Sequence, residues 1–159
     1  MKESEKVIAW IHDYFEKNGK GCKAVIGISG GTDSSVVCTL LVKAIGKERV
    51  DPVLIPNGTQ HDINVSYELI DFLGLKPLVI NIHDTYQALT EAIEKELDTS
   101  LSNCDCYYTN TPSRLRMTVL YGISAYVNGR VANTCNLSED YIGDRKSTRL
   151  NSSHCWSSR

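Results

Sequence analysis

A glycine-rich turn that joins a buried strand directly to an apolar helix is the feature that most constrains this chain. The strand is predicted over residues 23–28 and reads KAVIGI, a short run rich in β-branched side chains. The turn SGGTDS follows at once at residues 29–34, and the apolar helix is predicted over residues 34–45. Two adjacent glycines accept positive φ angles and let a ligand approach the backbone closely. This order of elements therefore predicts an α/β fold with a ligand at the turn.

Strands and helices go on alternating along most of the chain. Three further strands and four further helices are predicted, over residues 50–55, 78–82 and 130–134 and over residues 4–18, 61–73, 85–97 and 113–127. A polar loop is expected over residues 98–111, with Pro112 in the first turn of the last helix. The alternation predicts an α/β doubly wound fold, in which helices cover both faces of a mostly parallel sheet and ligands bind at the carboxyl ends of the strands.

Composition narrows the class of protein and its partners. The chain has 159 residues, which suits one domain, and a net charge of −2 from 17 basic and 19 acidic side chains. No overall basic field is available for nucleic acid, and no run approaches the roughly 20 apolar residues of a membrane span. The charged start MKESEKVIAW is unlike a secretory signal. We therefore expect a cytoplasmic protein that binds neither nucleic acid nor membranes.

The six cysteines follow no metal-binding spacing. Their only close pair, Cys104 and Cys106, lacks the two-residue gap and the second pair of a zinc site. Ordinary reduced thiols are therefore expected.

The residue types of the turn favour phosphate binding with a divalent cation. Successive amides at a glycine-rich turn and a helix N-terminus form a concave anion site, and Ser29, Ser34 and Ser35 add hydroxyl donors. A carboxylate there would repel phosphate unless a cation lay between them, so Asp33 indicates Mg²⁺. The alternative is that Asp33 only caps the helix. The turn has neither the ending of a Walker A loop nor the spacing of a dinucleotide-binding loop.

The turn SGGTDS resembles the pyrophosphate-binding loop of the ATP pyrophosphatases, enzymes that adenylate a substrate and release pyrophosphate. A second segment is NTPSRLRM at residues 110–117, continuing as TVLYGISAYVNGRVANTCNLSED. It is similar to NAD synthetases, in which an R-x-R-M helix start is followed one strand later by a T-x-x-x-x-E turn. The resemblance covers about residues 1–143, one domain, and implies the adenine nucleotide alpha-hydrolase-like fold.

The resemblance to NAD synthetases implies roles for single residues. The implied ATP-binding positions are Gly27, Ile28, Ser29, Gly30, Gly31, Thr32, Asp33, Ser34 and Thr134. Arg114 matches the arginine that contacts deamido-NAD, and Asp33 and Glu139 match the ligands of Mg²⁺. Thr32 departs from the aliphatic residue or glutamine common in relatives, at a position that supplies backbone more than side chain. The implied reaction amidates deamido-NAD to NAD with ATP and ammonia, through an adenylate that releases pyrophosphate and then AMP, in a homodimer.

The residues themselves support these assignments in part. Glu139 follows a predicted strand end, so it can reach the same rim of a parallel sheet as Asp33; alternatively, it is a surface residue of a short helix. Arg114 and Arg116 are predicted at a helix start, where positive charge is unfavourable, so a ligand phosphate or carboxylate is expected there. A solvated face is the alternative, above all for Arg116.

Other interpretations of the chain stay open. A GMP synthetase subunit, a tRNA thiolation enzyme or a non-catalytic ATP-binding module would share the turn, although the absence of a basic patch and a C-x-x-C pair argues against the tRNA enzyme. Residues 144–159 are rich in serine and are either a solvated, disordered terminus or sequence foreign to the protein. The family pattern continues beyond Gly143, so we expect about 143 native residues of a longer enzyme, with little or no synthetase activity alone.

Overall fold

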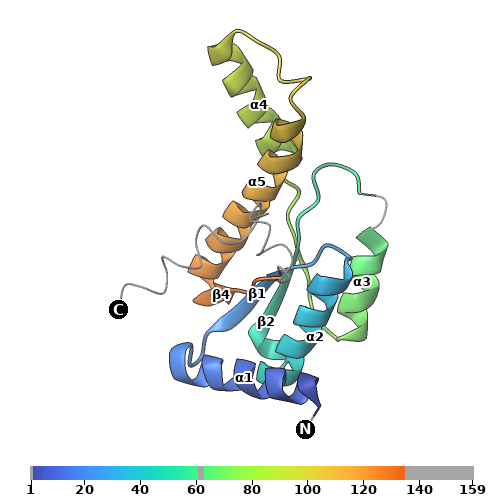
Figure 1. Ribbon diagram of the computed structural model, residues 1–159, viewed down its shortest axis with the longest axis vertical. Coiled ribbons are helices and arrows are strands. Elements are labelled where there is room, and N and C mark those ends of the chain that lie inside the picture. Colours follow the sequence, from blue (N-terminus) through green and yellow to red (C-terminus); the bar gives the residue numbers. More distant parts are fainter. Residues whose placement is uncertain (1, 61–62, 135–159) are drawn as a thin grey trace.

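The computed structural model describes residues 2–60 and 63–134, and in these ranges four parallel strands form one sheet with helices on both faces (Figure 1). The strands are β1 (Lys23–Gly27), β2 (Val50–Leu54), β3 (Leu78–Val79) and β4 (Gly129–Val131). The helices are α1 (Glu3–Asn18), α2 (Thr32–Ile45), α3 (Ile63–Phe72), α4 (His83–Leu97) and α5 (Asp105–Tyr126), with a short 3₁₀ turn, η1 (Lys47–Arg49), before β2. The predicted α/β class is confirmed.

Two apolar clusters lie on the two faces of the sheet, because neighbouring residues of a strand point to opposite sides. On one face, Ala24 and Ile26 of β1 belong to a cluster with side chains of α1, α2 and α3. On the other face, Val25 of β1 packs in a cluster with Val53 of β2 and Leu120 of α5. The continuous apolar run of β1 is thus buried from both sides, as the doubly wound arrangement requires.

The strand order β3-β2-β1-β4 places a change of direction beside β1. The chain passes from β1 through α2 to β2 and through α3 to β3, and then returns to add β4 on the opposite side of β1. Val25 is accordingly paired with Asp51 of β2 and with Val131 of β4. Where the order of strands reverses, the loops after the two strands diverge and leave a crevice for ligands at the carboxyl ends. The glycine-rich turn follows β1 at this point.

All four strands are shorter than predicted, β3 and β4 by the most, although hydrogen bonding continues past the ends of these two. β3 ends at Val79, but the Ile80 amide still donates to the Leu54 carbonyl at 2.9 Å. β4 ends at Val131, and the Ala132 amide donates to the Val25 carbonyl at 2.8 Å. The backbone therefore stays extended towards Thr134.

The largest departure from prediction lies before the last helix. α5 begins at Asp105, so the polar loop is shorter than predicted and Pro112 lies inside the helix, not in its first turn. A proline there removes one backbone hydrogen bond from the helix. The start of α5 is nevertheless in contact with α4. The Tyr107 hydroxyl lies 2.8 Å from Thr90 Oγ1, and the ring centroids of Tyr107 and Tyr86 are 5.9 Å apart.

α4 and the first part of α5 form an arm, residues 83–112, that projects away from the sheet (Figure 1). The second part of α5 lies against β1 and β4, so a single helix joins the arm to the sheet. Among the residues described, no helix has both the length and the apolar character needed to cross a membrane.

Candidate functional site

The turn after β1 is held in shape by its own hydroxyl groups. Ser29 Oγ accepts a hydrogen bond from the Gly31 amide at 3.3 Å. The hydroxyls of Ser34 and Ser35 both donate to the Gly31 carbonyl, at 3.1 and 2.8 Å. Gly30 has a φ of 81°, a left-handed conformation that favours glycine. The residues of the turn thus fix its conformation themselves.

The start of α2 presents the groups that the predicted anion site at the turn requires. Thr32, Asp33 and Ser34 begin this helix, and the first amides of an α-helix have no acceptor within the helix. Their N–H groups and the positive end of the helix dipole favour an anion. The dipole itself contributes only about 0.3–1 kcal/mol, so the fixed amides supply most of the attraction.

A cavity of about 570 Å³ lies beside the turn at the carboxyl ends of β1, β2 and β4, a volume within the usual range for small-molecule sites. Four of the predicted ATP-binding residues line it: Gly27, Ile28, Ser29 and Thr134. The other five form the rest of the turn and the start of α2: Gly30, Gly31, Thr32, Asp33 and Ser34. The structure therefore brings the turn and Thr134, which are far apart in the sequence, to the same edge of the sheet.

Two polar atoms in the cavity wall have no hydrogen-bond partner among the described residues. They are Asn57 Oδ1, in the segment after β2, and Ser66 Oγ, in α3. Both atoms are buried, and a buried polar atom left unpaired costs roughly 1–3 kcal/mol. Thr59 and Gln60 add two more polar side chains to the same wall.

The segment after β2 is tied to the start of α4. Asn81 Oδ1 accepts hydrogen bonds from the amides of Gly58 and His83, at 3.1 and 3.0 Å. Gly58 has a φ of 81°, and a Cβ at this position would lie 3.5 Å from His83 Nδ1. These contacts hold residues 57–60 in the cavity wall, next to the base of the arm.

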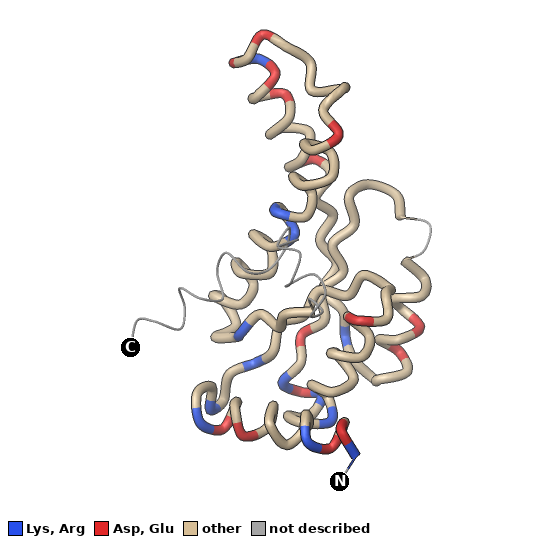
Figure 2. The backbone as a smooth tube through the Cα atoms, in the orientation of Figure 1, with Lys and Arg blue, Asp and Glu red and all other residues tan. Residues whose placement is uncertain are grey.

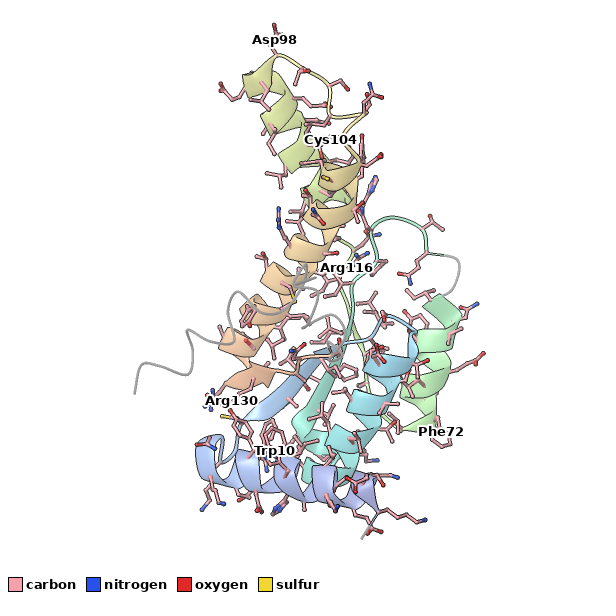
Figure 3. The ribbon with its side chains drawn as sticks, viewed as in Figure 1. Trp10, Phe72, Asp98, Cys104, Arg116 and Arg130 are labelled. Carbon is pink, nitrogen blue, oxygen red and sulfur yellow. The ribbon has the colours of Figure 1, made fainter. Side chains whose placement is uncertain are left out.

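The two arginines of the R-x-R-M segment lie in the middle of α5, so the prediction that they begin a helix is wrong. Residues two apart on a helix differ in direction by about 200°, so the two side chains cannot share one face. Arg116 lines the cavity, and its Nε donates to the Ile55 carbonyl at 2.9 Å (Figure 3). Arg114 is exposed and does not belong to the wall that the described residues form. Burial lowers the pKa of Arg116 below its usual range.

The turn fits Mg²⁺ through one described carboxylate. Asp33 lies in the first turn of α2 with its side chain exposed, beside the amides that suit phosphate. Mg²⁺ commonly takes one or two carboxylates together with phosphate oxygens of a substrate. Within residues 2–60 and 63–134 no three His, Cys, Asp or Glu side chains group as they would in a site built from protein ligands alone. Glu139, the second predicted ligand, lies outside the described residues.

Sequence reasoning gave little weight to the polar wall of the cavity outside the turn. Its residues are Asn57, Thr59, Gln60, Ser66, Ser113 and Arg116. One signal was available, because the segment after the second predicted strand lies at the carboxyl edge of a parallel sheet. The contributions of α3 and α5 depend on the phase of each helix, which the polar pattern of the sequence leaves open.

The chain resembles known proteins over nearly all of its described length. A family model described as NAD synthase matches residues 3–145. An NH(3)-dependent NAD(+) synthetase from Carboxydothermus hydrogenoformans is 32% identical over 143 residues, covering 89% of this chain and 57% of that relative.

Two solved structures are similar in fold and sequence. One is an NH3-dependent NAD synthetase from Campylobacter jejuni, with a TM-score of 0.73 and 32% identity, covering 88% of this chain and 58% of that one. The other is an NMN synthetase from Francisella tularensis, with a TM-score of 0.74 and 30% identity, covering 89% and 56%.

The chain thus spans a little more than half the length of these relatives. Its sheet and helices have the adenine nucleotide alpha-hydrolase-like fold that the resemblance implied. The matches favour an NAD synthetase over a GMP synthetase subunit or a tRNA thiolation enzyme.

Proposed function

Because this chain belongs to the NAD synthase family, we propose that it forms the ATP-binding part of an enzyme that amidates deamido-NAD to NAD with ammonia. The observation that carries the proposal is that Ser29 of the SGGTDS turn and Thr134 line one cavity, where the order of the strands reverses. Clustered amides and hydroxyls at that point suit the phosphate chain of ATP, the co-substrate used by this family.

The proposal gives each part of the site one task. The turn and the start of α2 bind the phosphates, and Thr134 contacts the nucleotide from the other side of β1. Arg114 contacts deamido-NAD. Asp33 and Glu139 would hold Mg²⁺, which when bound neutralises charge on the phosphates and on the departing pyrophosphate.

The chemistry follows from the weakness of a carboxylate as an acyl donor. A carboxylate oxygen of the nicotinate attacks the α-phosphorus of ATP, and the bond to the bridging oxygen of the β-phosphate breaks, so that pyrophosphate leaves. Ammonia then attacks the carbonyl carbon, the bond to AMP breaks, and loss of a proton from nitrogen gives the amide. The protein contributes by holding two anionic substrates in line against fixed amides, which lowers the cost of their approach.

We also propose that the enzyme is a cytoplasmic homodimer. The support for a dimer is the resemblance to NAD synthetases, which implies a homodimer. Sedimentation of the complete enzyme is expected to give twice the mass of one chain. A monomer at micromolar concentration would refute the dimer and leave the proposed activity standing.

The test uses this chain and a chimera in which residues 1–143 are followed by the C-terminal half of the C. hydrogenoformans relative. The chain is expected to bind ATP with Mg²⁺ in a calorimetric titration. The chimera is expected to release pyrophosphate and AMP from ATP when ammonia and deamido-NAD are both present. Asp33→Ala should abolish this release without changing the circular dichroism spectrum, because Asp33 is exposed. Asp13→Ala, at an exposed position on α1, is the matched control.

Each outcome separates one interpretation from the others. A folded chimera that binds ATP but releases no pyrophosphate with deamido-NAD would refute the synthetase proposal. Release with nicotinate mononucleotide in place of deamido-NAD would point instead to the activity named for the F. tularensis relative. Binding of ATP with no turnover of either substrate would indicate a non-catalytic module.

A further inference from the structure

We propose that Arg116 binds an oxyanion of a substrate in the cavity, through the two Nη groups of its guanidinium. This inference rests on the proposed function for the identity of the anion, which is either a phosphate group of ATP or the nicotinate carboxylate of deamido-NAD. It adds to the site an arginine other than Arg114, the one that the family resemblance points to.

Within the part of the chain that the structure describes, Arg116 is hydrogen-bonded through Nε alone. Its Nε donates to the Ile55 carbonyl at 2.9 Å, which fixes the plane of the guanidinium at the end of β2. No hydrogen bond from its Nη groups to another described residue is seen, although the side chain lines the cavity and is half-buried. A guanidinium held in this way presents its paired donors as a fork that matches phosphate or carboxylate.

The charges near Arg116 also favour an anionic ligand. The ion pairs seen within residues 2–60 and 63–134 involve other basic residues, namely Lys6, His12, Lys23 and Arg49. Residues 55–60, which face this part of α5, contain no acidic side chain (Figure 2). One turn along α5 in either direction there are again no carboxylates, since those positions hold Pro112, Ser113, Val119 and Leu120. Among the described residues Arg116 thus has no counterion; a half-buried cation in that state is costly, and an anionic ligand would remove that cost.

Arg116 also shares its cavity with residues that are predicted to bind ATP. The same cavity is lined by Ser29 of the turn, where the amides suit phosphate, and by Thr134. An anion that reaches the turn from the cavity therefore passes through the same cavity that the guanidinium lines. Arginine is the side chain best suited to such a position, because it stays charged even where burial disfavours charge.

A structural tie between α5 and β2 is the competing explanation, since the bond to Ile55 would also serve that purpose. Arg116→Gln removes the charge, and Arg116→Lys keeps the charge but loses the fork. Lys20→Gln removes one positive charge at an exposed turn on the opposite edge of the sheet and is the matched control. A tie predicts a lower melting temperature with unchanged binding, whereas an anion site predicts weaker binding.

Four ligands are titrated separately into the purified chain and its variants by calorimetry: ATP, deamido-NAD, NAD and inorganic pyrophosphate. Arg116→Gln is expected to weaken binding of ATP or of deamido-NAD by about 10- to 100-fold, with Arg116→Lys between this variant and the wild type. A loss for ATP and pyrophosphate assigns the anion to a phosphate. A loss for deamido-NAD but not for NAD assigns it to the carboxylate. Lys20→Gln is expected to change none of the four affinities by more than about twofold.

Binding of ATP and deamido-NAD within twofold of the wild type in both Arg116 variants would overturn the inference. Should Arg116→Gln fail to fold, Arg116→Lys decides alone, and unchanged affinity in that variant overturns the inference too. Should the wild-type chain bind no nucleotide, the proposed function fails, and pyrophosphate then decides on Arg116. If the wild-type chain binds pyrophosphate and the Arg116 variants do not, the anion site is upheld. If the wild-type chain does not bind pyrophosphate either, the anion site is refuted.

Discussion

The sheet and the arm are stabilised in different ways. In the sheet, Ala24, Val25 and Ile26 of β1 are each 0% exposed, and apolar clusters cover them from both faces. In the arm, α4 and the start of α5 contact each other mainly through aromatic rings and one hydroxyl pair, while Leu97 is 62% exposed. The fold of the sheet therefore depends on many buried groups together, and that of the arm on a few contacts.

This difference predicts how far the effect of a substitution spreads. A change in the sheet should lower the stability of the whole domain, because its buried groups unfold together. A change in the arm should act locally, because few buried groups join the arm to the rest of the chain. The comparison can be tested with one substitution at a time.

The largest effect is expected for Ile26→Ala in β1. Removal of a fully buried side chain from the middle of the sheet is expected to lower the free energy of unfolding by about 2–5 kcal/mol. Urea unfolding followed by circular dichroism measures this change. Leu97→Ala, at an exposed arm position, is the control and should change stability by less than about 0.5 kcal/mol. Equal effects of the two substitutions would contradict the comparison.

Gly30→Ala is expected to have the next largest effect. Its φ of 81° places an alanine in the left-handed region, at a cost of about 1–2 kcal/mol, and the distorted turn should also bind ATP more weakly. Gly122→Ala is the matched control, because this glycine lies inside α5 with open space around it. That substitution should instead stabilise the protein by up to about 1 kcal/mol. Thermal unfolding of the two variants distinguishes a required glycine from a tolerated one.

A smaller effect is expected for Tyr107→Phe in the arm. The substitution removes the hydroxyl that lies 2.8 Å from Thr90 Oγ1, at a cost of about 1 kcal/mol. Hydrogen exchange should become faster in α4 and in the first turns of α5 and stay unchanged in β1. Tyr126→Phe, at a position 92% exposed, should leave exchange unchanged throughout. Faster exchange in β1 as well would show that the arm and the sheet unfold as one unit.

The smallest effect concerns the thiols. Iodoacetamide at pH 8 is expected to modify Cys104 and Cys106, which are exposed, before the buried Cys22 and Cys38, as peptide mass spectrometry would show. Burial raises the pKa of Cys38 from 9.0 to about 11. The folded protein thus holds this proton more tightly than the unfolded chain, so stability should fall as pH rises from about 9 to about 11. Early modification of Cys38 would show that the sheet opens readily.

The parts that could be predicted from sequence are those that local pattern determines. Residues 23–45 form a strand, a turn and a helix as predicted. Their residue types alone, apolar in the strand and helix and glycine in the turn, indicate where the chain is buried and where φ is positive. The parallel sheet follows from the alternation, and the position of Thr134 beside the turn follows from strand ends meeting at one edge.

The errors concern contacts between segments that lie apart in the sequence. The helix begins at Asp105, and Tyr107 in its first turn contacts Thr90 of α4, a contact that nothing in residues 98–104 signals. Because the sequence predicts that this helix begins at residue 113, it also predicts Arg114 and Arg116 in the first turn. Both lie in the middle of α5. The side of α5 that faces the cavity could be found only from the packing of the helix on the sheet.

α5 also couples the arm mechanically to the cavity. This one helix carries both Tyr107, which contacts α4, and Arg116, which lines the cavity. Tyr107 lies near one end, Arg116 near the middle, and Leu120 is packed against the sheet. At about 1.5 Å per residue, the first two side chains lie roughly 14 Å apart along the axis. Pro112 stands between them and leaves that stretch of the helix without one internal hydrogen bond. A force on the arm would therefore act on the cavity through a helix that lacks one hydrogen bond about one turn before Arg116.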